Sequence, residues 1–202
     1  MPSEFDYKKF FNIANTEKIL SEKACYLADW INHISFFEQE QVFNKTKSGE
    51  FSNLKLLNSD PLSIEWFNFG RDIVVFYFYL INIELSFLTS KKSRESFMQD
   101  MFSHLMYSIW NLNEENNKDV ITYHSDTFNN RYKYYDTFSI MPQKSKMERV
   151  ENQINHYIDY INKKYFLEEN RDDCYKLSQF LKKNCLNFLM SVNLEIYIDK
   201  LE

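Results

Sequence analysis

Glycine and proline are scarce in this chain, whose 202 residues include two glycines, Gly49 and Gly70, and three prolines. Average usage is about 7% for glycine and about 5% for proline. Tight hairpins, dinucleotide-binding turns and phosphate-binding loops use glycine for positive φ angles or for close approach of the backbone. The scarcity therefore disfavours β-rich folds and nucleotide-dependent enzymes of the common folds. It favours long helices joined by short polar links.

Cysteine is also scarce and offers no pairing pattern. Cys25, Cys174 and Cys185 are odd in number, lie far apart and form no C-x-x-C pair. This usage is typical of thiols in a reducing compartment. Residues 1–6 are acidic and lack the charged-then-apolar order of a signal peptide. We therefore expect a cytoplasmic protein.

Long apolar runs are limited to one segment, residues 73–88. It is shorter than the about 20 residues that span a bilayer. It also contains Asn82 and Glu84, which are costly in lipid. We therefore expect the segment to form a central buried helix of a bundle and not a membrane span.

The charge balance contains no strongly basic region. The net charge is −5, from 24 basic and 29 acidic side chains, and acidic residues exceed basic ones in both halves of the chain. Such a balance does not favour nucleic acid as a partner. The hydrophobic fraction of 44% and the aromatic fraction of 18% are sufficient for a packed core.

Apolar residues recur at steps of three and four through most of the chain, the spacing of one helix face. Asp60 and Pro61 suit the N-cap and first position of a helix, and Gly70 marks either a close crossing or a break. The expected helices cover residues 3–13, about 15–44, 60–89, 93–111, 118–140, 147–161 and 174–192. The sequence thus predicts an all-α single domain over residues 1–202, a bundle of about six to seven helices around a central helix at roughly 72–89.

One helix face carries charges where a core is expected. In the predicted helix 118–140, His124 and Arg131 fall on the same face as Phe128, while the opposite face is polar. A buried guanidinium needs a carboxylate or carbonyl partner, or a wet cleft. Glu84 in the apolar helix is the first candidate partner and Asp72 the second. The network predicted from His124, Arg131 and Glu84 is either a structural ion pair or a binding or catalytic cleft.

A second basic pair lies on one helix further along. Arg149 and His156 are separated by six residues, a spacing similar to the Arg-x(4–6)-His pattern of HEPN-type helical ribonucleases. In that family, Arg and His from two protomers act on the RNA backbone. The similarity covers these two residues, and Val150 stands where the family usually has a polar residue. We assign no family from it, since such a pair also arises by chance on a helix.

Motifs for other chemistry are missing from the sequence. No glutamate has a histidine three residues later, as di-iron bundles require, and no His-x-x-x-His pair exists. No G-x-S-x-G elbow, Walker loop or dinucleotide fingerprint occurs. We therefore predict no metal site and no cofactor.

The remaining signal is the abundance of aromatic side chains. With 14 tyrosines, 19 phenylalanines and 3 tryptophans, some rings should lie at interfaces. Tyr26, Tyr107, Tyr132 and Tyr134 are the candidate binding residues. We expect a small protein that binds another protein, or a second copy of itself, as a regulator, an immunity-type inhibitor or a mobile-element accessory factor. The alternative is a helical enzyme that acts on RNA or a small substrate through either basic pair.

Overall fold

The computed structural model describes residues 20–52, 54–56, 58–60, 62–111, 114–137, 145–166, 171–192 and 194. Within these residues the fold is all-α, with six α-helices, one π-helical turn and no strand, so the predicted bundle is confirmed. The expected helix 3–13 lies outside the described residues. In chain order the elements are α2 (Leu20–Lys47), α3 (Ile64–Ser86), α4 (Lys91–Ser103), the π-helix η1 (His104–Ile109), α5 (Glu114–Thr137), α6 (Lys146–Tyr165) and α7 (Arg171–Ser191).

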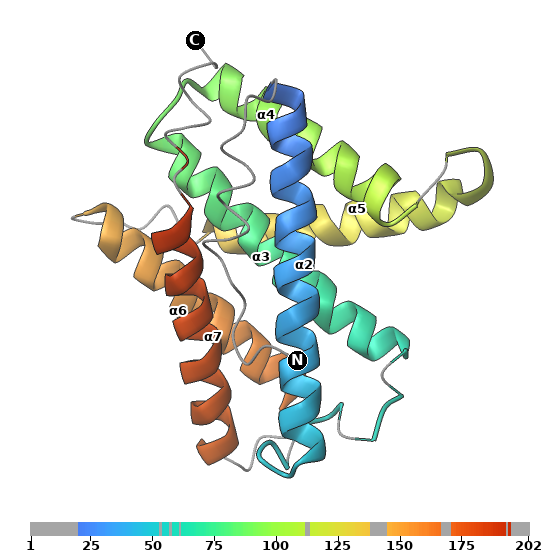
Figure 1. The fold of residues 1–202 in the computed structure, drawn as a ribbon, viewed down its shortest axis with the longest axis vertical. Coiled ribbons are helices and arrows are strands. Elements are labelled where there is room, and N and C mark those ends of the chain that lie inside the picture. Colours follow the sequence, from blue (N-terminus) through green and yellow to red (C-terminus); the bar gives the residue numbers. More distant parts are fainter. Residues whose placement is uncertain are drawn as a thin grey trace.

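Helix α3 is the centre of the bundle. Every residue from 71 to 81 is buried, so the helix is covered on all sides. It crosses behind the long helix α2 and also packs against α4, α5 and α6 (Figure 1). An apolar helix surrounded in this way needs no polar face, which explains its continuous hydrophobic sequence.

The ends of α3 differ from the prediction. The helix begins at Ile64, and the hydroxyl of its N-cap Ser63 accepts a hydrogen bond from the Trp66 amide. Asp60 is not the N-cap, because its carboxylate accepts the Leu62 amide at 2.7 Å within the preceding turn. The helix ends at Ser86, so the expected limits of 72–89 are corrected to 64–86.

Gly70 lies at the crossing of α2 and α3, and α3 continues through it without a break. A Cβ atom at this position would overlap the side-chain amide of Gln39 on α2. Glycine therefore permits a close approach of the two helices, which confirms one of the two predicted roles for Gly70.

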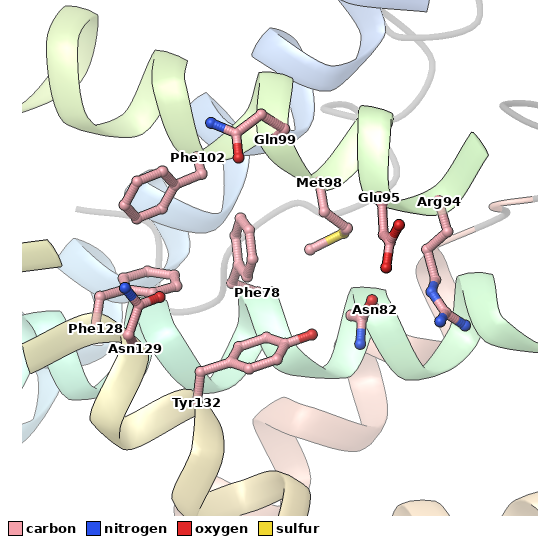
Figure 2. A pocket seen from close by; sticks show the side chains of 10 residues that line it. All are labelled: Phe78, Asn82, Arg94, Glu95, Met98, Gln99, Phe102, Phe128, Asn129 and Tyr132. Atoms are coloured by element: carbon pink, nitrogen blue, oxygen red, sulfur yellow. The ribbon is translucent and has the colours of Figure 1, made fainter. Parts of the chain in front are cut away.

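Helices α4 and α5 cover one side of α3. At the junction of α4 and η1, His104 Nε2 lies 3.0 Å from Asp29 Oδ1 on α2. Phe97 and Met101 of α4 and Leu105 of η1 recur at steps of four on one face and are buried. Side chains of α3, α4 and α5 leave a pocket between the three helices (Figure 2).

Helices α6 and α7 cover the other side. Along α6, Val150, Ile154, Tyr157 and Ile161 recur at steps of three and four and are buried, whereas Met147 in the first turn is 64% exposed. Met147 continues the helical spacing of this face into a first turn that faces solvent. The segment after α2 contacts the end of α6, where the backbone amide of Lys55 donates a hydrogen bond to the carbonyl of Tyr165 at 2.8 Å.

None of the described helices combines the length and the apolar character that crossing a lipid bilayer requires.

Candidate functional site

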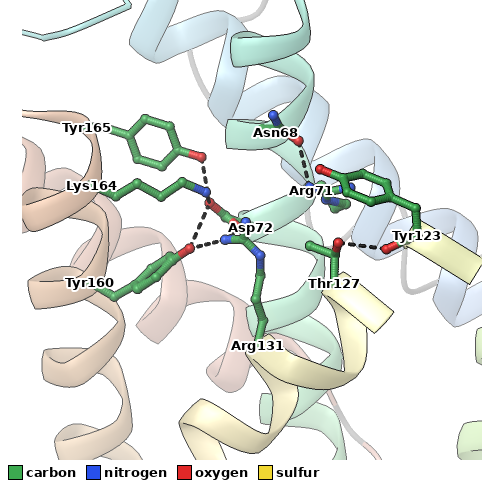
Figure 3. Close-up of polar contacts among 9 residues, drawn as sticks. All are labelled: Asn68, Arg71, Asp72, Tyr123, Thr127, Arg131, Tyr160, Lys164 and Tyr165. Carbon is green, nitrogen blue, oxygen red and sulfur yellow. Dashed lines mark hydrogen bonds and ion pairs between the residues drawn. The ribbon is translucent and has the colours of Figure 1, made fainter. Parts of the chain in front are cut away.

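A buried carboxylate, Asp72 of α3, collects basic and phenolic groups from two other helices (Figure 3). Its side chain is fully buried. The guanidinium of Arg131 on α5 forms an ion pair with it. From α6, Lys164 Nζ lies 2.7 Å from Asp72 Oδ2, and the Tyr165 hydroxyl donates to the same oxygen at 2.6 Å. The cluster therefore joins α3, α5 and α6 through one acidic group.

Positive charge exceeds negative charge around Asp72. Burial, together with the positive charges of Arg131 and Arg71, lowers the pKa of Lys164 to about 7. One carboxylate shared between Arg131 and Lys164 does not compensate for these effects. Burial and Arg131 lower the pKa of Arg71 in the same way, although the Tyr123 phenol partly opposes this shift.

The Asp72 cluster is closed rather than open. The Arg131 side chain is 15% exposed, and its guanidinium also donates to the Tyr160 hydroxyl and lies over the Tyr160 ring. Neither the pocket between α3, α4 and α5 nor a smaller cavity beside Phe67 is lined by Asp72 or Arg131. Each charged group is thus held by a neighbour in the bundle, as in a structural ion-pair network.

Glu84 is not brought to Arg131. It follows Asp72 by twelve positions on the same helix, about 18 Å along the axis at 1.5 Å per residue. Because Arg131 pairs with Asp72, the second predicted partner takes the place of the first. His124 belongs to α5, but its side chain lies outside the described part of the structure.

The second basic pair does not converge within one chain. Arg149 and His156 are seven positions apart on α6, about 10 Å along the axis, and both are half-buried. The Arg149 guanidinium lies over the ring of Phe87, which follows the last turn of α3, at 5.5 Å from the ring centroid. This contact gives Arg149 a packing role at the end of the central helix.

A group of exposed rings lies where α2, α3, α5 and η1 meet. Phe36 is 68% exposed, Phe67 40% and Tyr123 57%. The ring of Phe67 contacts that of Trp110 edge-on at 6.2 Å, and the Arg71 guanidinium lies over the rings of Phe67 and Tyr123. We call Phe36, Phe67, Trp110 and Tyr123 the aromatic surface.

The aromatic surface contains a small cavity of about 170 Å³. Phe36 of α2, Phe67 and Gly70 of α3, and Trp110 after η1 are among its walls. This volume is close to that of an apolar cavity that holds one benzene ring, and it is below the about 300 Å³ at which small-molecule sites begin. The cavity therefore has the size of a single side chain.

Sequence reasoning did not select the residues of the aromatic surface. Phe67 and Ile64, which is 60% exposed one turn earlier, precede the buried part of α3, and the sequence does not mark where burial begins. Phe36 lies beside Ser35 on α2, where apolar spacing alone does not separate an exposed ring from a core ring. Whether these rings are exposed depends on how the neighbouring helices pack, which the sequence does not show.

The four tyrosines predicted to bind a partner lie in different environments. Tyr107 is 43% exposed on η1 and Tyr134 is 37% exposed on α5. Tyr26 on α2 is half-buried, and burial together with the nearby Asp29 raises its pKa. Tyr132 packs edge-on against Tyr79 and borders the pocket between α3, α4 and α5. The four tyrosines thus lie on three elements, α2, η1 and α5.

Fold and contacts together define an all-α bundle with a closed ion-pair network and an exposed aromatic surface. Comparisons of the chain with protein-family models, with curated proteins and with solved structures found no match.

Proposed function

We propose that this protein acts by binding another protein through the aromatic surface. The observation that carries the proposal is the side-chain-sized cavity among exposed rings. Aromatic residues and arginine dominate the energetics of protein interfaces, and Arg71 lies between Phe67 and Tyr123. Exposed apolar patches of this kind mark interaction sites on soluble proteins.

The partner proposed for this surface presents an apolar side chain, such as leucine or phenylalanine, that enters the cavity. A hydrophobic anchor in a pocket surrounded by rings excludes water from the contact. A second copy of the chain is an alternative partner, because Phe36 and Phe67 could serve as anchors as well as walls. We propose a role in the cytoplasm, which the absence of a disulfide among the three cysteines supports.

The Asp72 cluster has a supporting role in this proposal. It fixes the register of α5 and α6 against α3, and Tyr123 on α5 contributes to the aromatic surface. The closed geometry of the cluster gives no support to the enzymatic alternative through Arg131. Loss of the cluster should therefore affect stability before it affects partner binding.

Proximity labelling in the native cell, with the protein fused to a labelling enzyme, tests the proposal. We compare the wild type with Phe67→Ala and Phe36→Ala. A partner that binds this surface is labelled by the wild type and is depleted in both variants, because an anchor-pocket residue contributes about 2 kcal/mol or more to binding. Purified partner and titration calorimetry then give the affinity change directly.

Met190→Ala provides the matched control, because Met190 is 78% exposed on α7. It should retain every partner that the wild type labels. Sedimentation of the purified protein over a concentration series tests the second-copy alternative. If every partner retained by Met190→Ala is also retained by both phenylalanine variants, and neither variant changes self-association, the proposal is wrong.

A further inference from the structure

The pocket between α3, α4 and α5 is separate from the aromatic surface and has a different size. Its volume is about 550 Å³. Small-molecule sites span roughly 300–1,000 Å³, whereas a single side chain needs far less. The pocket is therefore large enough for a small organic ligand.

The floor of the pocket is aromatic. Phe78 of α3 and Phe128 of α5 are 5% and 2% exposed, and their rings meet edge-on at 4.9 Å. Phe102 of α4 contacts Phe128 edge-on at 5.0 Å, and Tyr132 of α5 contacts Phe78 at 6.1 Å. Rings that already interact with one another form a rigid wall against which a further planar ring can pack.

Amide side chains surround this floor. Asn82 comes from α3, Gln99 from α4 and Asn129 from α5, and all three border the same pocket (Figure 2). Asn82 is half-buried on the most apolar helix, where an amide without a hydrogen-bond partner is costly. Neither Asn82 nor Asn129 makes a side-chain hydrogen bond to another described residue. Each amide offers both a donor and an acceptor to a ligand.

The pocket is bordered by one positive and one negative side chain. Arg94 and Glu95 are adjacent on α4 and both border it, and Glu95 also lies 3.7 Å from Lys91 Nζ. A phosphate or carboxylate ligand would meet the Glu95 carboxylate as well as the Arg94 guanidinium. The balance of charge therefore favours a ligand without a net charge.

We propose that this pocket binds a small, uncharged, planar heteroaromatic molecule of the nucleobase or nucleoside class. The aromatic floor packs against the plane of the ligand. The amides of Asn82 and Asn129 pair with the donors and acceptors at its edge. This inference is independent of the aromatic surface, because the two sites share no lining residue.

Methionine-methyl NMR tests the proposal on the intact protein. Met98 borders the pocket and is 8% exposed, so its methyl signal reports on a ligand there. Met98→Leu identifies the signal. Adenosine, guanosine, cytidine and uridine are titrated to roughly 5 mM, which would largely occupy a site of about 1 mM affinity. We expect at least one nucleoside to shift the Met98 signal saturably, while Met147 on α6 and Met190 on α7 stay unchanged.

The ligand class is tested with Asn82→Leu, a substitution of similar size that removes the amide. It should weaken nucleoside binding about tenfold or more and leave binding of indole, an apolar planar ring, within about threefold. Asn155→Leu on the exposed face of α6 is the matched control, and thermal unfolding verifies that both variants fold. A Met98 signal that no nucleoside shifts, or a nucleoside affinity that Asn82→Leu leaves unchanged, would overturn the proposal.

Discussion

At the scale of single residues, Asp72 determines how α5 and α6 attach to the central helix. Its carboxylate is fully buried and receives Arg131, Lys164 and the Tyr165 hydroxyl. Two cations, Arg131 and Lys164, share the single carboxylate of Asp72, so loss of the anion and loss of one cation have different consequences. Removing the anion leaves two partly buried cations, whereas removing one cation leaves the anion with partners.

Substitutions at Asp72 and Arg131 should reveal this asymmetry. We expect Asp72→Asn to lower the free energy of unfolding by about 3–5 kcal/mol, the loss typical when one member of a buried ion pair is removed. Arg131→Met should cost less, because Lys164 and Tyr165 still satisfy Asp72. Urea denaturation monitored by circular dichroism measures both variants. An equal or larger loss for Arg131→Met would show that Asp72 is not the centre of the network.

The pKa of Lys164 provides an independent test of the same cluster. The positive charge of Arg131 is one cause of its decrease to about 7, so Arg131→Met should raise it toward the usual range for lysine. NMR titration of the Lys164 side chain gives the pKa in both proteins. Lys176 serves as an internal control, because it pairs with Asp172 on α7 and should titrate alike in the two. An unchanged Lys164 pKa would contradict the described charge coupling.

The sequence identified only part of this cluster. Arg131 was found because it interrupts an apolar helix face, and Asp72 because it lies at the start of the most apolar segment. The sequence led us to expect Glu84 rather than Asp72 as the partner of Arg131. Helix periodicity shows which face of a helix a residue lies on, but it does not show which residues of two packed helices lie at the same level. Lys164 and Tyr165 gave no signal, since a basic residue near a helix C-terminus is ordinary.

At the scale of elements, the crossing of α2 and α3 depends on Gly70. Glycine inside a helix costs about 1 kcal/mol relative to alanine, so its presence requires a compensating contact. The compensation is the approach of Gln39, whose amide occupies the space of the missing Cβ atom.

Gly70→Ala should therefore gain helix propensity and lose packing, with a net change in unfolding free energy within about 1 kcal/mol. Adding Gln39→Ala removes the overlap, so we expect the Gly70→Ala change to become stabilising by about 1 kcal/mol in that background. A double-mutant cycle by urea denaturation measures the coupling. Simple additivity of the two changes would show that Gln39 and position 70 do not compete for space.

Helices were easier to predict than their ends. Apolar periodicity located every described α-helix, because burial of one face is the main determinant of helix position. The start of α3 was wrong because Asp60 and Ser63 are both good caps, and local sequence does not say which carboxyl or hydroxyl group is used. The π-helical turn η1 and the positive φ of Asn111 after it were not predicted, since apolar spacing does not distinguish a π-helical turn from a turn of α-helix.

At the scale of the whole molecule, two titratable groups have pKa values shifted in opposite directions. Glu38 of α2 is 1% exposed and accepts a hydrogen bond from the Tyr77 hydroxyl of α3. Burial raises the pKa of Glu38 to about 8, despite hydrogen bonds that lower it. Lys164 has the opposite property, because burial lowers its pKa to about 7. Both groups therefore hold a smaller charge in the folded protein than in the unfolded chain near neutral pH.

The consequence is a stability profile with a minimum between about pH 7 and pH 8 from these two groups. Glu38 contributes stability that is full below its unfolded pKa of 4.5 and is lost as the pH rises to about 8, because over this range the unfolded state has lost a proton that the folded state still holds. Lys164 contributes stability that is full above its unfolded pKa of 10.5 and is lost as the pH falls through 7.

Glu38→Gln should flatten the acid arm of the profile, and Lys164→Met should flatten the alkaline arm. Unfolding free energies measured from about pH 5 to pH 10 in the wild type and both variants separate the two arms. If either variant kept the slope of the wild type on its own arm, the buried group in question would be charged in the folded bundle.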